Sequence, residues 1–219
     1  MAKSYRHIIW DWNGTLLDDC DYSIGVMNTL LRTRGLPLLD RARYHDVFDF
    51  PVQLYYSRLG FDAAKDDFHS LSVEFITGYD ARRLECALHS GTRPTLAAIQ
   101  RAGRTQSVLS AYRHETLCEI IAHFELTAHF RELAGLDNIY AHSKLELGRR
   151  QLARLGVPAS EVVLIGDTVH DGEVARELGV DCVLVAAGHH SAAKLRRHHD
   201  RVVETLAELS SVPGLEFVS

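Results

Sequence analysis

Residues 6–19, with the sequence RHIIWDWNGTLLDD, constrain the fold of this chain more than any other stretch. The apolar run at residues 7–10 is rich in β-branched and aromatic types, which predicts a buried parallel strand that leads directly into Asp11. Gly14 allows the chain to turn sharply after that strand, and Thr15 can hydrogen-bond back into the turn. Since open α/β sheets bind ligands at the carboxyl ends of their strands, Asp11 is placed for function, although an isolated Asp here could equally cap a helix.

Length and charge narrow the class of protein. A chain of 219 residues suits one large α/β domain, or a core domain with a modest insert. The net charge of -5 argues against a nucleic-acid partner and against an anionic-membrane anchor, so a small solute is the expected partner. The first strand begins by His7, which leaves no room for a leader, and no apolar run approaches membrane-spanning length. We therefore expect a cytoplasmic protein, either a monomer or a homodimer.

The cysteines and histidines do not form a metal-site or redox-site pattern. No C-x-x-C pair occurs, so reduced and mostly buried cysteines are expected. The 13 histidines include doublets at residues 189–190 and 198–199, but no acidic or cysteine ligands accompany them at the spacing of a zinc site. The cysteines are Cys20, Cys86, Cys118 and Cys182.

Strand and helix patterns alternate from residue 85 onward. This alternation predicts an α/β fold with a doubly wound, mainly parallel sheet, in a core domain of residues 1–16 and 85–219. The expected strands after the first are residues 105–109, 131–134, 161–165, 182–185 and 201–203. The expected helices are residues 95–102, 115–124, 144–155, 172–178 and 206–209.

Residues 17–84 have a different pattern. They contain no good strand candidate, and apolar residues recur at helical spacing in residues 23–33, 51–59 and 67–76. We predict an inserted all-helical cap domain of four or five helices over residues 17–84. Because the insert directly follows a strand with a functional end, it is expected to close over the site as a lid.

Polar residues follow several of the expected strands, and parallel strands bring their carboxyl ends to one edge of a sheet. We therefore expect Asp11, Ser110, Lys144, Asp167 and Asp171 to converge. Taken one at a time, Ser110 could cap a helix and Lys144 could be a solvated surface lysine. Together they match phosphoryl transfer, in which a carboxylate nucleophile must be shielded from the charge of the phosphate by a hard divalent cation with oxygen ligands.

This set of residues resembles the four motifs of the haloacid dehalogenase superfamily. Residues 11–15 resemble the first motif, Ser110 the second, Lys144 the third, and residues 166–171 the fourth. The insert lies between the first two motifs, where the family places its helical cap, and the chain is most similar to the phosphoglycolate phosphatase-like branch. The resemblance implies a Mg²⁺-dependent phosphatase that hydrolyses small phosphate monoesters through an aspartyl-phosphate on Asp11.

The resemblance also implies roles for individual residues. The implied catalytic residues are Asp11, Asn13, Ser110 and Lys144. The implied Mg²⁺ ligands are Asp11, the carbonyl oxygen of Asn13, Asp167 and, at least partly through water, Asp171. The implied substrate contacts are Gly14, Thr15, Ser110, Ala111, Lys144, Phe50 and His189. Phe50 belongs to a loop, residues 47–51, that resembles the segment this branch lowers over the leaving group, although its aromatic residues could equally be cap core.

Asn13 departs from the pattern of the family's phosphatases. They carry a second Asp at this position, which protonates the leaving group and later activates water. An amide cannot titrate, and general acid–base catalysis is worth about 10²–10⁴ in rate, so turnover should be slow unless a histidine such as His170 or His189 supplies the proton. On this basis Asn13→Asp should raise the turnover of alkyl esters by up to about 10²-fold.

Other activities stay open at this point. One is a phosphonoacetaldehyde-hydrolase-like or other C–P or acyl-phosphate hydrolase, although the first of these needs a cap lysine and the insert contains only Lys65. A dehalogenase needs no metal, which fits the Asp167/Asp171 pair poorly. A receiver-type signalling domain would be much shorter and would lack a cap. A catalytically weakened phosphate-binding protein of the same fold is the remaining alternative.

Overall fold

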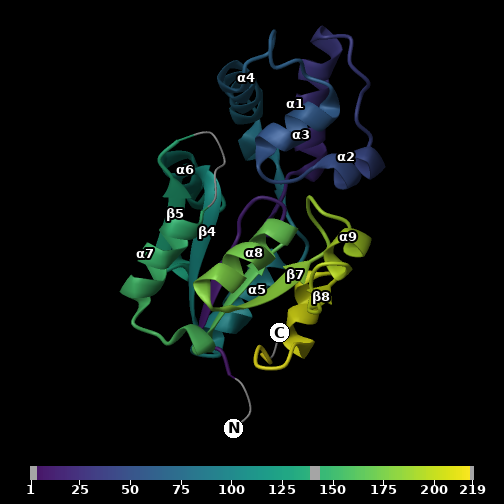
Figure 1. Cartoon of the computed structure of the whole chain (residues 1–219). Coiled ribbons are helices and arrows are strands. Elements are labelled where there is room, and N and C mark those ends of the chain that lie inside the picture. Colours follow the sequence, from purple (N-terminus) through teal and green to yellow (C-terminus); the bar gives the residue numbers. More distant parts are fainter. Residues whose placement is uncertain (1–3, 139–143, 218–219) are drawn as a thin grey trace.

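The computed structural model describes residues 4–138 and 144–217. In Figure 1 the chain forms a sheet with flanking helices, and a second group of helices stands on one end of that sheet. The strands of the main sheet are β1 (His7–Trp10), β4 (Thr105–Arg113), β5 (Glu132–Leu136), β6 (Val162–Gly166), β7 (Asp181–Val185) and β8 (Val202–Val203).

The main sheet has the strand order β5-β4-β1-β6-β7-β8. Every neighbouring pair of these strands is parallel, so the predicted doubly wound, parallel sheet is confirmed. The strand β1 lies between β4 and β6, with Trp10 level with Val108 on one side and with Ile165 on the other. The first strand of the chain is therefore the centre of the sheet, and Asp11 directly follows it.

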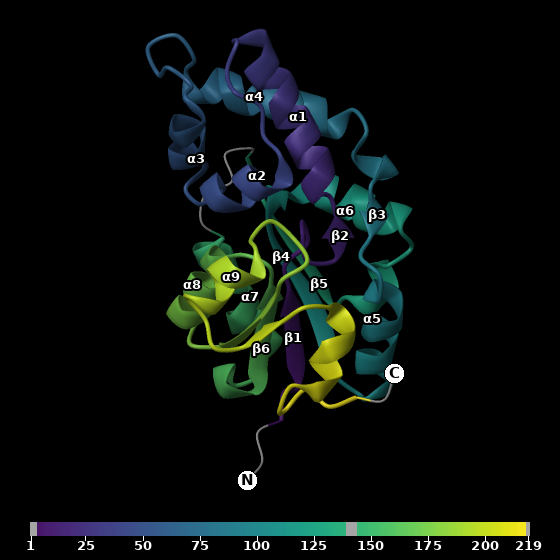
Figure 2. The ribbon, with the colours of Figure 1, turned by 90° about the vertical axis from the view of Figure 1, so that its right-hand side faces the viewer.

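Helices cover both faces of the sheet. They are α5 (Thr92–Arg101), α6 (His114–His123), α7 (Leu145–Leu155), α8 (Val169–Leu178) and α9 (Ala192–Arg196). Ile8 and Trp10 belong to the hydrophobic cluster that includes α5 and α6, whereas Ile9 belongs to the cluster that includes α7 and α8. Successive side chains of a strand point to opposite faces, so β1 anchors both layers. Figure 2 shows α5 and α8 on opposite sides of the sheet.

The segment between β1 and α5 leaves the sheet and returns to it. Its elements are β2 (Leu17–Asp18), α1 (Cys20–Thr33), α2 (Arg41–Val47), α3 (Val52–Leu59), α4 (Phe68–Asp80), a 3-10 helix η1 (Arg83–Glu85) and β3 (Ala87–Leu88). β2 pairs with β3 in an antiparallel ribbon that joins the four α-helices to the core (Figure 2). The expectation that residues 17–84 contain no strand is therefore wrong at Leu17–Asp18, because a two-residue pairing leaves no alternating pattern in the sequence.

Some element boundaries also differ from the sequence-based expectation. The strand expected at residues 105–109 continues to Arg113, so Ser110 and Ala111 lie inside β4 and not after it. The register between β4 and β5 shifts along this extension, and such an irregularity redirects side chains at a sheet edge. The last expected helix, residues 206–209, is a 3-10 helix, η4 (Leu206–Ser211). The sequence did not predict α2 and α9, because helices of 7 and 5 residues have too few turns to show a period.

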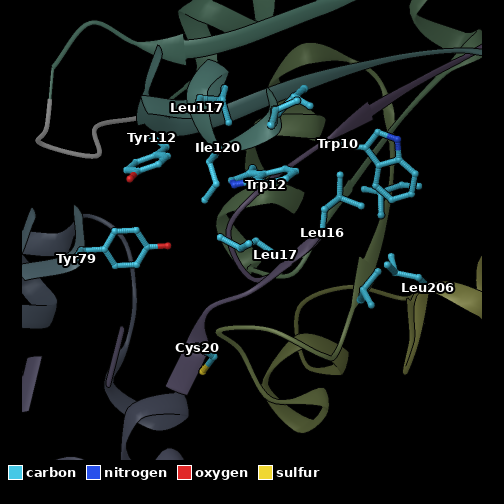
Figure 3. Packing of buried hydrophobic residues seen from close by; sticks show 14 of the residues in the cluster. Trp10, Trp12, Leu16, Leu17, Cys20, Tyr79, Tyr112, Leu117, Ile120 and Leu206 are labelled. Carbon is cyan, nitrogen blue, oxygen red and sulfur yellow. The ribbon is translucent and has the colours of Figure 1, made fainter. Parts of the chain in front are cut away.

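Hydrophobic packing continues from the sheet, through the loop after β1, toward the inserted helices. Trp12 and Leu16 have no exposed side-chain surface and pack in the same cluster as Leu117 and Ile120 of α6 (Figure 3). Because protein interiors are close-packed, this contact leaves the loop that follows β1 little freedom to move. Apolar side chains of the core thus hold the loop that begins with Asp11 in place.

We expect Gly135→Ala to lower the free energy of unfolding by roughly 1–3 kcal/mol, because an added Cβ would lie 2.6 Å from the Cα of His114 and 2.7 Å from the carbonyl oxygen of Tyr112. Urea unfolding at equilibrium measures this. Gly25→Ala is the matched control, since a Cβ there meets nothing within 4 Å and Ala favours the helix by up to about 1 kcal/mol. Equal midpoints for the two variants would contradict the close packing of β5 on the start of α6.

Candidate active site

Three buried carboxylates meet at the carboxyl edge of the sheet. Asp11 follows β1, Asp167 follows β6, and Asp171 lies in the first turn of α8. Oxygen atoms of all three lie within 4.8 Å of one another, and none of the side chains is substantially exposed. The convergence predicted from the strand ends is therefore present, and the cluster could hold a metal ion.

Lys144 lies directly against this cluster. It is the N-terminal cap residue of α7, and its Nζ donates to Asp11 Oδ1 and, at 2.7 Å, lies against Asp171 Oδ1. Burial alone would lower the pKa of the Lys144 ammonium, but the two adjacent carboxylates raise it above its usual value. The lysine is therefore a permanent positive charge inside the site.

One ammonium does not balance three carboxylates. Burial raises the pKa of Asp11 to about 7, against the opposing effect of Lys144, and raises the pKa of Asp167 to about 6. A divalent cation would supply the missing positive charge, and a donor set made only of oxygen atoms suits a hard cation such as Mg²⁺. The residues present therefore fit a bound magnesium ion.

Asp171 is already held by two neighbours. Its Oδ2 accepts hydrogen bonds from the backbone nitrogen of Thr168 at 3.0 Å and from Thr168 Oγ1 at 2.6 Å, as part of the capping box that begins α8. Its Oδ1 faces Lys144. With both oxygens occupied, Asp171 is better placed to orient a water ligand than to bind a metal directly.

Asp167 is packed between two glycine-containing loops. Thr15 Oγ1 donates to Asp167 Oδ1 at 2.8 Å, and the backbone nitrogen of His189 donates to Asp167 Oδ2 at 2.6 Å. A Cβ at Gly14 would lie 2.3 Å from Asp167 Oδ2, and one at Gly188 would lie 2.2 Å from it. Glycine is therefore required at both positions for this carboxylate to fit.

The side chain of Asn13 is held by residues that the sequence did not single out. Its Nδ2 donates to Asp19 Oδ2 at 2.9 Å and to the hydroxyl of Tyr79 at 2.8 Å, and Tyr79 itself donates to Asp19 at 2.6 Å. Burial by itself would raise the pKa of the Asp19 carboxyl, but His189 and these hydrogen bonds keep it below its usual value. A buried carboxylate thus lies next to Asn13, although it comes from position 19 of the chain.

His189 connects this carboxylate to the inserted helices. Its Nε2 lies 3.5 Å from Asp19 Oδ1, and its Nδ1 is 2.9 Å from the hydroxyl of Tyr44 in α2. Burial would lower the pKa of the His189 imidazole, but Asp19 raises it well above its usual value. Both ring nitrogens already have protein partners, which leaves the ring face as the part of His189 that a substrate could contact.

A chamber of about 180 Å³ lies between the inserted helices and the core. Of the expected site residues, its walls include Asp11, Asn13, Phe50, Ser110, Ala111, Lys144, Asp171 and His189. Gly14, Thr15 and Asp167 are not among the residues of this wall, although Asp167 belongs to the carboxylate cluster and Thr15 Oγ1 donates to it. The ring of Phe50 stacks on that of His170, with centroids 4.8 Å apart.

The sequence analysis missed two functional candidates, Asp19 and Tyr79. It named a third, His170, but could not predict its position in the site. Asp19 is the second of two consecutive aspartates, and nothing in that doublet shows which one is buried. Tyr79 lies in α4, 60 positions from its partner Asp19, so no local pattern connects them. Ser110 Oγ, as expected, is buried at the site and accepts a hydrogen bond from the backbone nitrogen of Tyr112 at 3.1 Å.

Comparisons with known proteins agree with the geometry. Residues 8–185 match the family described as haloacid dehalogenase-like hydrolase. The chain is 30% identical to a 5'-nucleotidase from Pseudomonas aeruginosa over 205 residues, 90% of each chain. It is 25% identical to the tyrosine-protein kinase PtkA from Mycobacterium tuberculosis over 219 residues, which cover 98% of this chain and 74% of that protein.

A solved structure shares the fold of this chain. The crystal structure of a predicted phosphatase from Clostridium acetobutylicum matches with a TM-score of 0.81 at 18% identity, over 95% of this chain and 97% of that one. Within residues 4–138 and 144–217, no helix has both the length and the apolar character needed to cross a membrane. Since the family match covers most of the sequence, the chain belongs to the haloacid dehalogenase-like hydrolases and is an enzyme of the phosphatase type within that family.

Proposed function

We propose that this protein is a Mg²⁺-dependent phosphatase that hydrolyses small phosphate monoesters through an aspartyl-phosphate formed on Asp11. The observation that carries the proposal is the contact of Asp11 with Lys144 at the chamber wall, with two further buried carboxylates within 4.8 Å. A carboxylate nucleophile next to an ammonium donor and an oxygen-lined cation site is the arrangement that phosphoryl transfer needs.

We assign the Mg²⁺ ligands to Asp11, the carbonyl oxygen of Asn13 and Asp167, with Asp171 acting through water. When bound, the ion neutralises the charge between the attacking carboxylate and the phosphoryl oxygens. Lys144 would bind one phosphoryl oxygen, and the hydroxyl of Ser110 would donate to another. The backbone of Gly14 and Thr15 completes the loop that faces the phosphate.

The reaction proceeds in two steps. An oxygen of Asp11 attacks phosphorus, and the bond from phosphorus to the alcohol oxygen of the substrate breaks. Water then hydrolyses the aspartyl-phosphate to release inorganic phosphate. The alcohol must gain a proton in the first step and the water must lose one in the second. Asn13 can position these groups by hydrogen bonding, but its amide can neither donate a proton to the alcohol nor accept one from the water.

The inserted helices act as the lid in this proposal, which takes residues 17–84 as the cap and the remainder as the core. The loop between α2 and α3 is fastened to the core at three points. Lys194 Nζ donates to the carbonyl of Phe48 at 2.6 Å, His190 Nε2 donates to the same carbonyl at 3.0 Å, and Lys194 lies 3.6 Å from Asp49. Closure of this kind excludes water from a reactive acyl phosphate.

A phosphonoacetaldehyde-hydrolase-like activity is less well supported. It would need a lysine of the insert inside the chamber. Lys65, the only lysine of residues 17–84, has a side chain that is 81% exposed and pairs with Asp62 at 3.3 Å. It does not line the chamber.

We expect Asp11→Asn to abolish turnover of aryl phosphates and to prevent any covalent phosphate adduct, because an amide is not a nucleophile toward phosphorus. Mass spectrometry of the acid-quenched enzyme and a rate assay measure the two effects. Circular dichroism should show an unchanged fold. Appreciable residual turnover by the variant would mean that another group attacks the substrate.

Mg²⁺ should raise the melting temperature of the native protein, and chelation should remove both this gain and the activity, because an ion that binds only the folded state stabilises it. Asp167→Ala should abolish the Mg²⁺-dependent rise. Asp62→Ala, which alters an exposed carboxylate far from the cluster, is the control and should retain the rise. Unchanged Mg²⁺ affinity of Asp167→Ala in calorimetry would refute the ligand assignment.

Asn13→Asp places a second carboxylate next to Asp19, so the gain in turnover that the sequence predicts should need two changes. The single variant should lose stability as the pH rises from about 5 to about 8, because like charge and burial raise the pKa of the added carboxyl in the folded state. In Asn13→Asp/Asp19→Asn the amide and carboxylate exchange places and can still hydrogen-bond. This double variant should hydrolyse alkyl phosphates up to about 10²-fold faster than the native protein.

The measurements for this prediction are kcat on an alkyl ester and the melting temperature between pH 5 and pH 8. If Asn13→Asp alone were as stable as the native protein and faster than the double variant, the contact with Asp19 would not control position 13.

A further inference from the structure

We propose that the chamber selects phosphate monoesters whose alcohol carries a flat, uncharged ring, and that it disfavours substrates with a second anionic group. This inference rests on the proposed phosphatase function and deepens it by naming the class of leaving group. Three features of the chamber carry it: its ring-lined walls, an unpaired acceptor beside one of these rings, and its charge.

Aromatic rings form much of the wall beyond the phosphate position. They include Phe48, Phe50, Phe75 and Tyr79 from the cap and Tyr112 from β4. Neighbouring rings stand at different angles: the planes of Phe75 and Tyr79 are 23° apart, whereas those of Tyr79 and Tyr112 are 81° apart. A flat ring entering such walls can stack on one ring and meet the edge of another, which a saturated ring cannot do.

The pair formed by Phe50 and His170 adds a polar atom to this wall. Nδ1 of His170 lies 3.3 Å from a carboxylate oxygen of Glu173, which directs the Nδ1 proton to that oxygen. The other nitrogen, Nε2, is buried and has no hydrogen-bond partner among residues 4–138 and 144–217. A buried acceptor without a partner is costly, so a ligand N–H or O–H at the edge of the ring would satisfy it.

Most charged groups of the chamber are already paired with one another, which leaves little free positive charge for a second anion. Among the described residues, the cations in its wall are Lys144, Arg113 and His189. Lys144 is committed to the carboxylate cluster and His189 to Asp19, while Arg113 pairs with Glu115 at 3.0 Å. The carboxylates in the same wall are Asp11, Asp19, Asp80 and Asp171. A carboxylate or second phosphate on the leaving group would therefore meet mainly like charge.

Binding tests the ring preference without requiring turnover. The probes are 3-phenylpropylphosphonate and 3-cyclohexylpropylphosphonate, which differ only in the flatness of the ring and lack the ester bond. With Mg²⁺ and the native protein, calorimetry should give a Kd about tenfold lower for the phenyl compound. Equal affinities, or tighter binding of the cyclohexyl compound, would overturn the proposal.

Turnover measurements test which kind of ring the chamber prefers and whether it disfavours a second anionic group. Nucleoside 5'-monophosphates and ribose 5-phosphate share a primary alcohol, so a higher kcat/KM for a nucleotide would assign the ring to a nucleobase. A preference for 2-phenylethyl over 2-cyclohexylethyl phosphate, without a preference for nucleotides, would assign it to a simple arene. Absence of both preferences would overturn the proposal, as would a higher kcat/KM for phosphoglycolate than for ethyl phosphate.

Phe50→Leu should reduce the phenyl-to-cyclohexyl ratio of affinities several-fold, because it removes the ring that stacks on His170. Leu54→Ala is the matched control, since Leu54 is 51% exposed and does not line the chamber, and it should leave the ratio unchanged. An unchanged ratio in Phe50→Leu would overturn the role of this wall.

The two levels of the proposal fail separately. A preserved binding preference without Mg²⁺-dependent hydrolysis of any ester would refute the phosphatase and leave the ring selectivity intact. Hydrolysis of every ester at similar kcat/KM would refute the ring selectivity and leave the phosphatase intact.

Discussion

The contact of the Lys144 ammonium with the carboxylates of Asp11 and Asp171 is the interaction on which the site depends. Charges at the end of a buried strand are unfavourable unless they are paired, and an unpaired partner in such a cluster leaves the other charges uncompensated. The strand order brings Asp11 and Asp167 to adjacent positions, and the start of α7 places the lysine against Asp11 and Asp171. The remaining negative charge is the physical reason for proposing a divalent cation.

A second buried network connects this cluster to the inserted helices. Asp19 accepts hydrogen bonds from Asn13 and from Tyr79 of α4, and it faces His189, whose other nitrogen meets Tyr44 of α2. The residue that departs from the family pattern therefore belongs to a set of contacts that spans both parts of the molecule. Any change in the position of the cap acts on Asn13 through Tyr79 and on the loop of Asp167 through His189. In the proposed mechanism, these side chains would couple closure of the cap to the proton chemistry at Asn13.

The chamber between cap and core combines a charged floor with largely apolar walls. At the floor, oxygen atoms and one ammonium suit a phosphoryl group and its metal ion. In the walls, rings such as Phe50 and Phe75 offer flat apolar surface and little unpaired positive charge. Hydrogen bonds from Lys194 and His190 to the carbonyl oxygen of Phe48 hold the loop between α2 and α3, which carries Phe48 and Phe50, against the core.

The sequence by itself determined the architecture and most of the candidate site. The apolar run before Asp11 and the alternation after residue 85 predicted the parallel sheet, and the ends of its strands correctly brought Asp11, Lys144 and the pair Asp167 and Asp171 together. These inferences succeeded because strand direction and strand-end position are local properties of a parallel sheet. Their chemical roles stay predictions, as does the division of the chain into cap and core.

Only the tertiary structure decided what surrounds Asn13 and what lines the chamber. Asp19 precedes α1, Tyr79 lies in α4 and His189 lies in a core loop, and no periodicity connects residues so far apart in the chain. The two-residue ribbon strands and the extension of β4 past Ser110 were missed for a related reason, since pairing partners and not the local sequence create them. Hydrophobic spacing specifies which elements form, whereas the burial of a particular carboxylate depends on which distant donors the packed fold brings to it.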